Sequence, residues 1–133
     1  MIRRHRDFAP TPESVGAARG FVSAVLSELA TTGLHPLAPS ARLVVSELAS
    51  NAVQHAHTPF AVEVCCDPGV VISVEDASPA PPELRDQSPN ALRGRGLFLV
   101  DKMCERWGFE RTDKGKRVWG RLSATGPALG TPP

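Results

Sequence analysis

Three polar side chains recur every four residues in the segment ELASNAVQHA, residues 47–56: Glu47, Asn51 and His55. In a helix, a step of four residues turns the chain by about 400°, so each side chain drifts only about 40° from the one before it. The three side chains therefore form one row, at the edge of an apolar arc made by the intervening valine, leucine and alanine residues. The row holds an acid and an amide at the border of the core, where a carboxylate can take a proton and an amide oxygen can bind a hard cation.

A second candidate carboxylate, that of Asp76, lies near the end of the segment VVISVEDA, residues 70–77. If this segment is a strand, its period of two places Asp76 on the apolar face, at the end of a row of valine and isoleucine. A carboxylate buried there needs a hydrogen-bond donor, because burying it unpaired costs several kcal/mol. An amino group of a ligand would supply the donor. The alternative is an Asx turn, in which Asp76 caps the loop at Ser78.

A third candidate feature is GRGLFLV, residues 94–100. Glycine lets the backbone approach a ligand closely, and the first N–H groups of a helix attract anions. Gly94 and Gly96 before a predicted helix therefore form a possible anion site. An ordinary junction between a loop and a helix is an equally common explanation of this pattern, and a dinucleotide fingerprint is excluded because its third glycine is missing.

These side chains are positioned by a predicted α+β two-layer sandwich, with a mixed sheet of about five strands and about three helices on one face. Apolar periodicity and turn residues predict strands at 2–10, 60–66 and 70–77, helices at 11–33, 40–57 and 97–107, and a closing hairpin at 107–124 with its turn at 113–116. Pro12 and Glu13 favour the start of the first helix. We predict one domain over residues 1–123 and a disordered tail over 124–133.

Composition narrows the functional classes. The chain has 133 residues, 41% of them hydrophobic and 22% charged, which is enough for one soluble domain with its own core. A net charge of +1 gives no electrostatic reason to expect direct nucleic-acid binding, and no apolar run is long enough to span a membrane. Three cysteines without metal-ligand spacing, and no signal peptide, predict free thiols and a cytoplasmic location.

In this order, the three features resemble the ATP-binding fold of histidine kinases and gyrase (the Bergerat fold), in its branch of small anti-sigma-factor serine/threonine kinases. The resemblance covers roughly residues 5–123. It rests on VVSELASNAVQHA as the N box, VEDASPAPP and GRGLFLVDKM as the two glycine boxes, and GKRVWGRL as the closing strand.

The resemblance implies a role for each matching residue. Glu47 would orient or deprotonate the attacking hydroxyl, Asn51 would bind a Mg²⁺ shared with the ATP phosphates, and Asp76 would accept the adenine amino group. The residues implied to bind the nucleotide are Asn51, His55, Asp76, Ser78, Arg93, Gly94, Arg95, Gly96 and Leu97. The segment from Ser78 to Arg93 would be a mobile lid. Phosphoryl transfer requires mainly positioning and charge neutralisation, which an acid beside a Mg²⁺ ligand can provide.

Two of these assignments have a competing structural interpretation. In the row of Glu47, Asn51 and His55, the last residue lies nearest to the apolar arc, which favours a hydrogen-bonded structural role for His55. Arg19 matches an arginine with which the branch engages its protein partner, and we expect it to be exposed on the first helix. A solvated helix arginine is the alternative.

The chain also departs from the family pattern. Ser78 and Pro79 stand where the first glycine box usually has glycine, and Lys116 and Arg117 replace two threonines of the closing strand. Three functions stay open: a Mg²⁺-ATP-dependent kinase that phosphorylates an anti-sigma antagonist and sequesters a sigma factor, a nucleotide-binding partner switch without kinase activity, and an interaction domain that binds no nucleotide. Family members commonly form homodimers.

Overall fold

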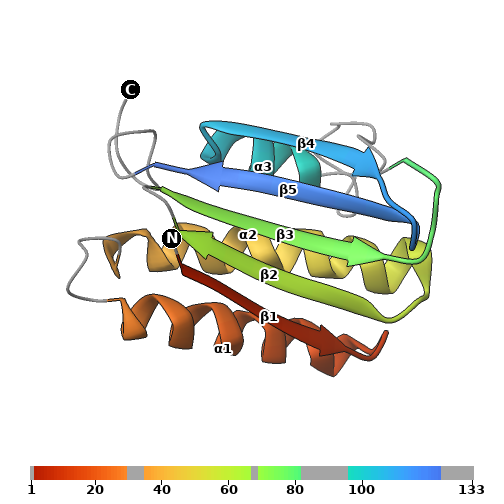
Figure 1. Cartoon of the computed structure of the whole chain (residues 1–133), viewed down its shortest axis with the longest axis horizontal. Coiled ribbons are helices and arrows are strands. Elements are labelled where there is room, and N and C mark those ends of the chain that lie inside the picture. Colours follow the sequence, from red (N-terminus) through yellow and green to blue (C-terminus); the bar gives the residue numbers. More distant parts are fainter. Residues whose placement is uncertain (1, 30–34, 67–68, 82–95, 124–133) are drawn as a thin grey trace, which may run out of the picture.

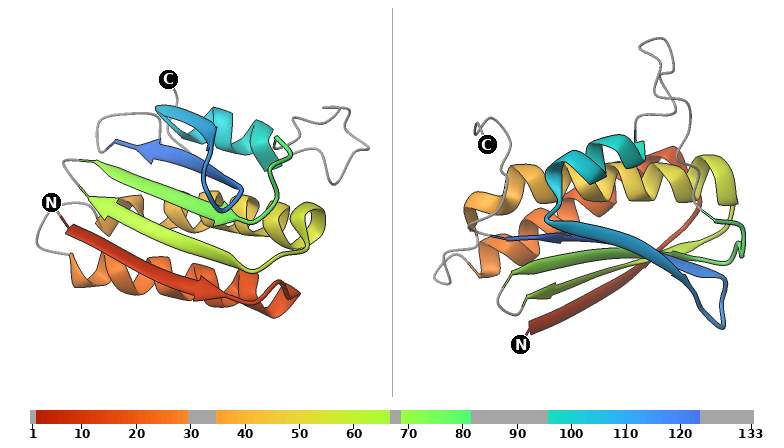
Figure 2. Two further views of the ribbon diagram at one scale, coloured as in Figure 1. Left: turned by 45° about the vertical axis from the view of Figure 1, so that its right-hand side comes forward. Right: turned by 90° about the horizontal axis from the view of Figure 1, so that it is seen from above.

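The computed structural model describes residues 2–29, 35–66, 69–81 and 96–123, which form two layers (Figure 1). Five strands make one sheet in the order β1-β2-β3-β5-β4. The strands are β1 (Ile2–Phe8), β2 (Phe60–Cys66), β3 (Val70–Asp76), β4 (Arg106–Arg111) and β5 (Lys116–Leu122), and the helices are α1 (Pro12–Glu28), α2 (Ala38–Asn51) and α3 (Gly96–Met103). Seen from above, all three helices cover the same face of the sheet (Figure 2). The predicted α+β sandwich is confirmed.

All four strand pairings are antiparallel, whereas the sequence analysis predicted a mixed sheet. The two helices between β1 and β2 run in opposite directions, so the chain re-enters the sheet antiparallel to β1 (Figure 1). Among the described residues between β3 and β4, the helix α3 returns the chain, and β4 runs in the direction of β3. However, β5 folds back between these two strands, so no parallel neighbours result.

The helix α1 starts where its sequence predicted. Pro12 lies in the first turn, where its missing N–H costs nothing, and Glu13 follows it near the positive helix end. The buried face of this helix packs on the core through Ala18, Val22 and Leu26.

The helix α2 follows a short 3₁₀ turn, η2 (His35–Leu37), and continues into a π-helical turn, η3 (Ala52–Ala56). The backbone N–H of His57 donates to the Ala52 carbonyl at 3.0 Å, five residues back, which is the hydrogen bond of a π-helix. His57 then adopts a left-handed conformation, with φ of 57°, and ends the helix. A π-turn is uncommon and frequently lies at a functional site.

The helix α3 ends at Met103, not at Trp107 as predicted. The Glu105 N–H donates to the Arg121 carbonyl at 2.9 Å, so the backbone has already joined the sheet. The hairpin of β4 and β5 that follows is confirmed, and its turn is closed by two backbone hydrogen bonds between Thr112 and Gly115.

Alternation in the central strands produces the core. The inner side chains of β2 and β3, among them Val62, Val64 and Ile72, are buried beneath α1 and α2. All three cysteines are free thiols, and burial, with a smaller contribution from Asp101, raises the pKa of Cys104 to about 12. In the described residues, no helix is both long and apolar enough to cross a membrane.

Candidate functional site

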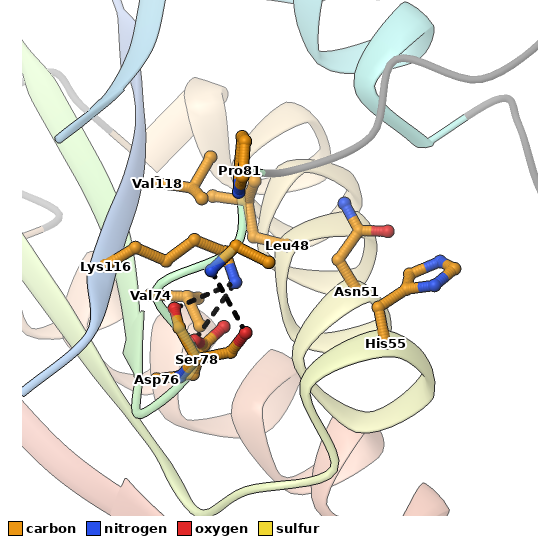
Figure 3. A pocket seen from close by; sticks show the side chains of 10 residues that line it. Leu48, Asn51, His55, Val74, Asp76, Ser78, Pro81, Lys116 and Val118 are labelled. Carbon is orange, nitrogen blue, oxygen red and sulfur yellow. Dashed lines mark hydrogen bonds and ion pairs between the residues drawn. The ribbon is translucent and has the colours of Figure 1, made fainter. Parts of the chain in front are cut away.

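A cavity of about 160 Å³ opens between α2 and the ends of β3 and β5 (Figure 3). Its walls combine apolar and polar side chains: Leu48, Asn51, His55, Val74, Asp76, Ser78, Ala80, Pro81, Lys116 and Val118. Small-molecule sites in proteins typically measure about 300–1,000 Å³, so this cavity has room for part of a nucleotide, such as its base. Asn51, His55, Asp76 and Ser78, predicted from the sequence to share a site, are thus brought together.

At the sheet end of the cavity, Asp76 is buried as predicted, at the end of the apolar row of β3. Its carboxylate is paired with Lys116, whose ammonium lies 3.1 Å from Oδ1. The two side chains are only 4% and 7% exposed, respectively, which makes the contact a buried ion pair. The donor that a buried carboxylate requires is therefore supplied by the chain itself.

The same carboxylate oxygen closes a turn. The Ser78 N–H donates to Oδ1 of Asp76 at 2.9 Å, so the Asx turn considered as an alternative is present. In the described part of the chain, Oδ1 accepts both hydrogen bonds of the carboxylate and Oδ2 accepts none. The turn and a ligand contact are therefore compatible, because Oδ1 closes the turn and Oδ2 stays available to a ligand.

Strand register brings the pair together. Asp76 and Lys116 are direct partners in the antiparallel ladder of β3 and β5. Gly115 comes immediately before Lys116, and a Cβ placed on it would overlap the Asp76 carbonyl oxygen. Only glycine lets the hairpin turn approach the end of β3 this closely.

At the helix end of the cavity, Asn51 is half-buried and its Nδ2 is one of three buried side-chain N/O atoms without a hydrogen-bond partner in the described residues. An unpaired buried amide costs free energy, so a partner from a ligand would stabilise it. The two amide atoms are hard to distinguish, and either the oxygen or the nitrogen can face that ligand.

His55 is exposed at the mouth of the cavity, so the structural interpretation favoured by the helical wheel is wrong. That interpretation assumed an α-helix through residue 55. The π-turn η3 has more residues per turn, which rotates His55 away from the core and back toward the row of Asn51.

Glu47 lies one turn before Asn51 and is half-buried, but it does not line the cavity. Burial removes water from its carboxylate and raises its pKa above the ordinary value of 4.5. A raised pKa makes a carboxylate a stronger base near neutral pH.

The anion site predicted around GRGL is only partly visible. Arg93, Gly94 and Arg95 lie outside the described residues, as does most of the lid predicted after Ser78. Gly96 is the first residue of α3, and Leu97 is 1% exposed within the core. A side-chain contact between Leu97 and a ligand is thus excluded, and its backbone N–H is the group left for phosphate.

Arg19 is half-buried and not exposed as predicted. Its Nη1 donates to Ser46 Oγ on α2 at 3.2 Å, while Ser46 Oγ donates to the Arg42 carbonyl at 2.8 Å. The stem of a long side chain can lie along a neighbouring helix while its head stays accessible.

No group of three histidine, cysteine, aspartate or glutamate side chains that could hold a metal occurs among the described residues. Mg²⁺ in nucleotide sites is usually held by one or two protein oxygens together with phosphates and water. With its amide turned so that the oxygen faces the cavity, the half-buried Asn51 fits such a site with few protein ligands.

The comparison that decides the family is a match to the model of the histidine kinase-like ATPase domain, which covers residues 8–122. The chain belongs to this family. A comparison with curated proteins gave no match. As a histidine kinase-like ATPase domain, the chain is a nucleotide-binding domain, and its cavity lies between Asn51 on α2 and Asp76 on β3.

Among the polar residues that line the cavity of this ATPase domain, Lys116 is the one to which the sequence analysis gives no site role. It appears there only as a departure from the threonine of related closing strands. The pairing of β3 with β5 was the missing information, because 40 residues separate Lys116 from Asp76 in the chain.

Proposed function

We propose that this chain is a Mg²⁺-ATP-dependent serine/threonine kinase that phosphorylates an anti-sigma antagonist and sequesters a sigma factor. One observation carries the kinase proposal. Half-buried Glu47, with its raised pKa, lies one helical turn from Asn51, whose amide has no partner in the described chain. A base next to a metal ligand is the arrangement that transfer to a hydroxyl group requires.

The residues divide the task between them. Asn51 and the first N–H groups of α3 would hold Mg²⁺ and phosphate, and Asp76 would hold the base of the nucleotide. Bound Mg²⁺-ATP supplies the phosphoryl group and neutralises its charge. Glu47 would orient the hydroxyl group of the antagonist and take its proton on a carboxylate oxygen.

The second candidate is a partner switch that binds nucleotide without transferring phosphate. The buried pair of Asp76 and Lys116 favours the partner switch. Lys116 replaces the threonine that the family pattern has on the closing strand, so the proposed base site differs from the family pattern beside Asp76. Binding and sequestration need fewer groups than transfer does, and Arg19 on α1 would contact the partner in both candidates.

Two measurements test the proposal. Mg²⁺-ATP should raise the melting temperature of the protein, since a ligand bound only by the native state stabilises it. Incubation with radiolabelled ATP and a candidate antagonist domain should then yield phosphoserine or phosphothreonine. A melting shift without transfer to any antagonist supports the switch, whereas no shift with any nucleotide contradicts both candidates.

A further inference from the structure

The ion pair at the sheet end of the cavity leaves hydrogen-bonding groups unused. Lys116 has three N–H groups, and in the described chain its ammonium contacts Asp76 Oδ1 at 3.1 Å and the Ser78 carbonyl at 3.5 Å. One N–H therefore remains without a protein partner among these residues. Asp76 similarly keeps Oδ2, since its two hydrogen bonds are both made by Oδ1.

Asp76 and Lys116 are neighbours, and both residues line the same cavity (Figure 3). A free donor thus lies beside a free acceptor on a buried surface. A site with Asp76 alone would offer a base only acceptors. The lysine changes the chemistry of this site from acceptor only to acceptor plus donor.

Purines present a matching pair of groups. Adenine has an amino donor at position 6 next to a ring-nitrogen acceptor at position 1, and a 6-oxopurine has the reverse, a carbonyl acceptor next to an N–H donor. A carboxylate alone rejects the carbonyl, because a buried acceptor would face a buried acceptor. With Lys116 beside Asp76, each order finds one donor and one acceptor, provided that the base is turned over in the site between the two cases.

We propose that Lys116 is a specificity-determining residue of the nucleotide site, and that the site binds 6-oxopurine nucleotides, such as guanine nucleotides, as well as adenine nucleotides. In this arrangement Asp76 Oδ2 accepts from the amino or N–H group of the base. The free N–H of Lys116 donates to ring nitrogen 1 of adenine or to the carbonyl at position 6. The inference rests on the nucleotide site of the proposed function and adds the class of base.

A competing role for Lys116 has a different consequence. If the ammonium only occupied the space of the base, its removal would strengthen the binding of every purine nucleotide. If it donates to the base, its removal should weaken the binding of adenine and 6-oxopurine nucleotides alike, because ring nitrogen 1 of adenine and the carbonyl at position 6 each lose their donor.

Calorimetry with Mg²⁺ and ADP, GDP or inosine diphosphate distinguishes these roles without any turnover. For the unaltered protein we expect ADP and GDP affinities within about tenfold, and inosine diphosphate close to GDP, since the two share the groups at positions 1 and 6. In Lys116→Met, the binding of ADP and of GDP should each weaken about ten- to a hundredfold. Lys114→Met removes an equal charge from the exposed turn of the same hairpin and should change neither affinity.

Several results would overturn the inference. They are a preference for ADP above a hundredfold in the unaltered protein, tighter binding of all three nucleotides by Lys116→Met, or binding of GDP but not of inosine diphosphate. The comparison of the three nucleotides on the unaltered protein needs no variant, so it decides the matter even if Lys116→Met does not fold. Binding of ADP alone rejects this inference and leaves the proposed function standing, whereas binding of none rejects both.

Discussion

The two ends of the cavity satisfy their polar groups differently. At the sheet end, Asp76 and Lys116 form a buried ion pair that also anchors the Asx turn at Ser78. At the helix end, the Asn51 amide nitrogen has no partner in the described chain, and one turn earlier on α2, outside the cavity lining, burial raises the pKa of Glu47. The sheet end is thus preorganised by the protein itself, whereas the helix end keeps a polar group that remains available to a ligand.

The difference has an energetic meaning. Removing one partner of a buried ion pair typically costs about 3–5 kcal/mol, because the other charge is left without compensation. An unpaired amide already bears its cost in the free protein, and a ligand removes that cost on binding. Mutations at the sheet end should therefore affect folding, and mutations at the helix end should affect binding and chemistry.

The largest expected effect is at the helix end. Glu47→Ala should keep Mg²⁺-ATP affinity and lose transfer to the antagonist by about a hundred- to ten-thousandfold, which is typical of a positioned acid–base group. Asn51→Ala should instead lose Mg²⁺-dependent affinity, because the metal has few protein ligands to spare. Calorimetry and radiolabel transfer measure the two separately. Undiminished transfer by Glu47→Ala would refute its role as the base.

At the sheet end, Asp76→Asn should lower the free energy of unfolding by about 3–5 kcal/mol, because it leaves the Lys116 ammonium buried without a counter-charge. The double variant Asp76→Asn with Lys116→Met should recover most of this loss. Urea unfolding at pH 7 measures both. Glu110→Gln, which breaks the exposed pair with Arg117 in the same hairpin, is the control and should cost no more than about 1 kcal/mol. An equal cost for Asp76→Asn and Glu110→Gln would contradict the contrast between the two ends.

The same substitution should also weaken the binding of ATP and ADP. A lost charged hydrogen bond to the base costs about 1.5–3 kcal/mol, or about ten- to a hundredfold in affinity. Calorimetry at a temperature where Asp76→Asn is still folded, as judged by circular dichroism, gives the value. Unchanged affinity in the folded variant would remove Asp76 from the base site.

A smaller effect is expected on α1, away from both ends of the cavity. Arg19→Glu should reduce capture of the sigma factor or antagonist by about tenfold or more, while nucleotide affinity stays within twofold. Its loss of the Ser46 hydrogen bond should cost only about 0.5–1.5 kcal/mol of stability. Ser46→Ala removes the same hydrogen bond and keeps the charge, so it separates packing from partner contact. Capture that falls equally in both variants would mean that Arg19 acts through packing alone.

The smallest effect concerns the ionisation of Glu47. Its pKa is raised in the folded protein, so folding favours the protonated form, and stability decreases as the pH rises from about 4.5 through the folded pKa. Glu47→Gln should therefore melt about 1–3 °C above the unaltered protein at pH 7, with the difference vanishing at pH 4. Melting curves over this range measure it. A difference that grows toward low pH would have the wrong sign for desolvation.

Sequence alone predicted the parts of this molecule that depend on local pattern. The row of Glu47 and Asn51, the buried position of Asp76 and the closing hairpin follow from helical and strand periodicity, and the structure confirms them. Three features required information that no local pattern contains. The pairing of Asp76 with Lys116 depends on the register of two strands that lie far apart in the sequence. The π-turn at His55 depends on one extra residue in a helical turn, which changes no apolar pattern. The end of α3 is set by the hydrogen bond between Glu105 and Arg121 in the sheet.

The tight approach of Gly115 to the end of β3 has a consequence for how this family can evolve. Any other residue at position 115 must push the hairpin away from Asp76, so substitutions there are incompatible with the present backbone. Position 116, one residue later, bears a side chain that lines the cavity beside Asp76. Lysine and threonine codons differ by a single nucleotide, so one point mutation can exchange the group beside Asp76, at the cost of its counter-charge.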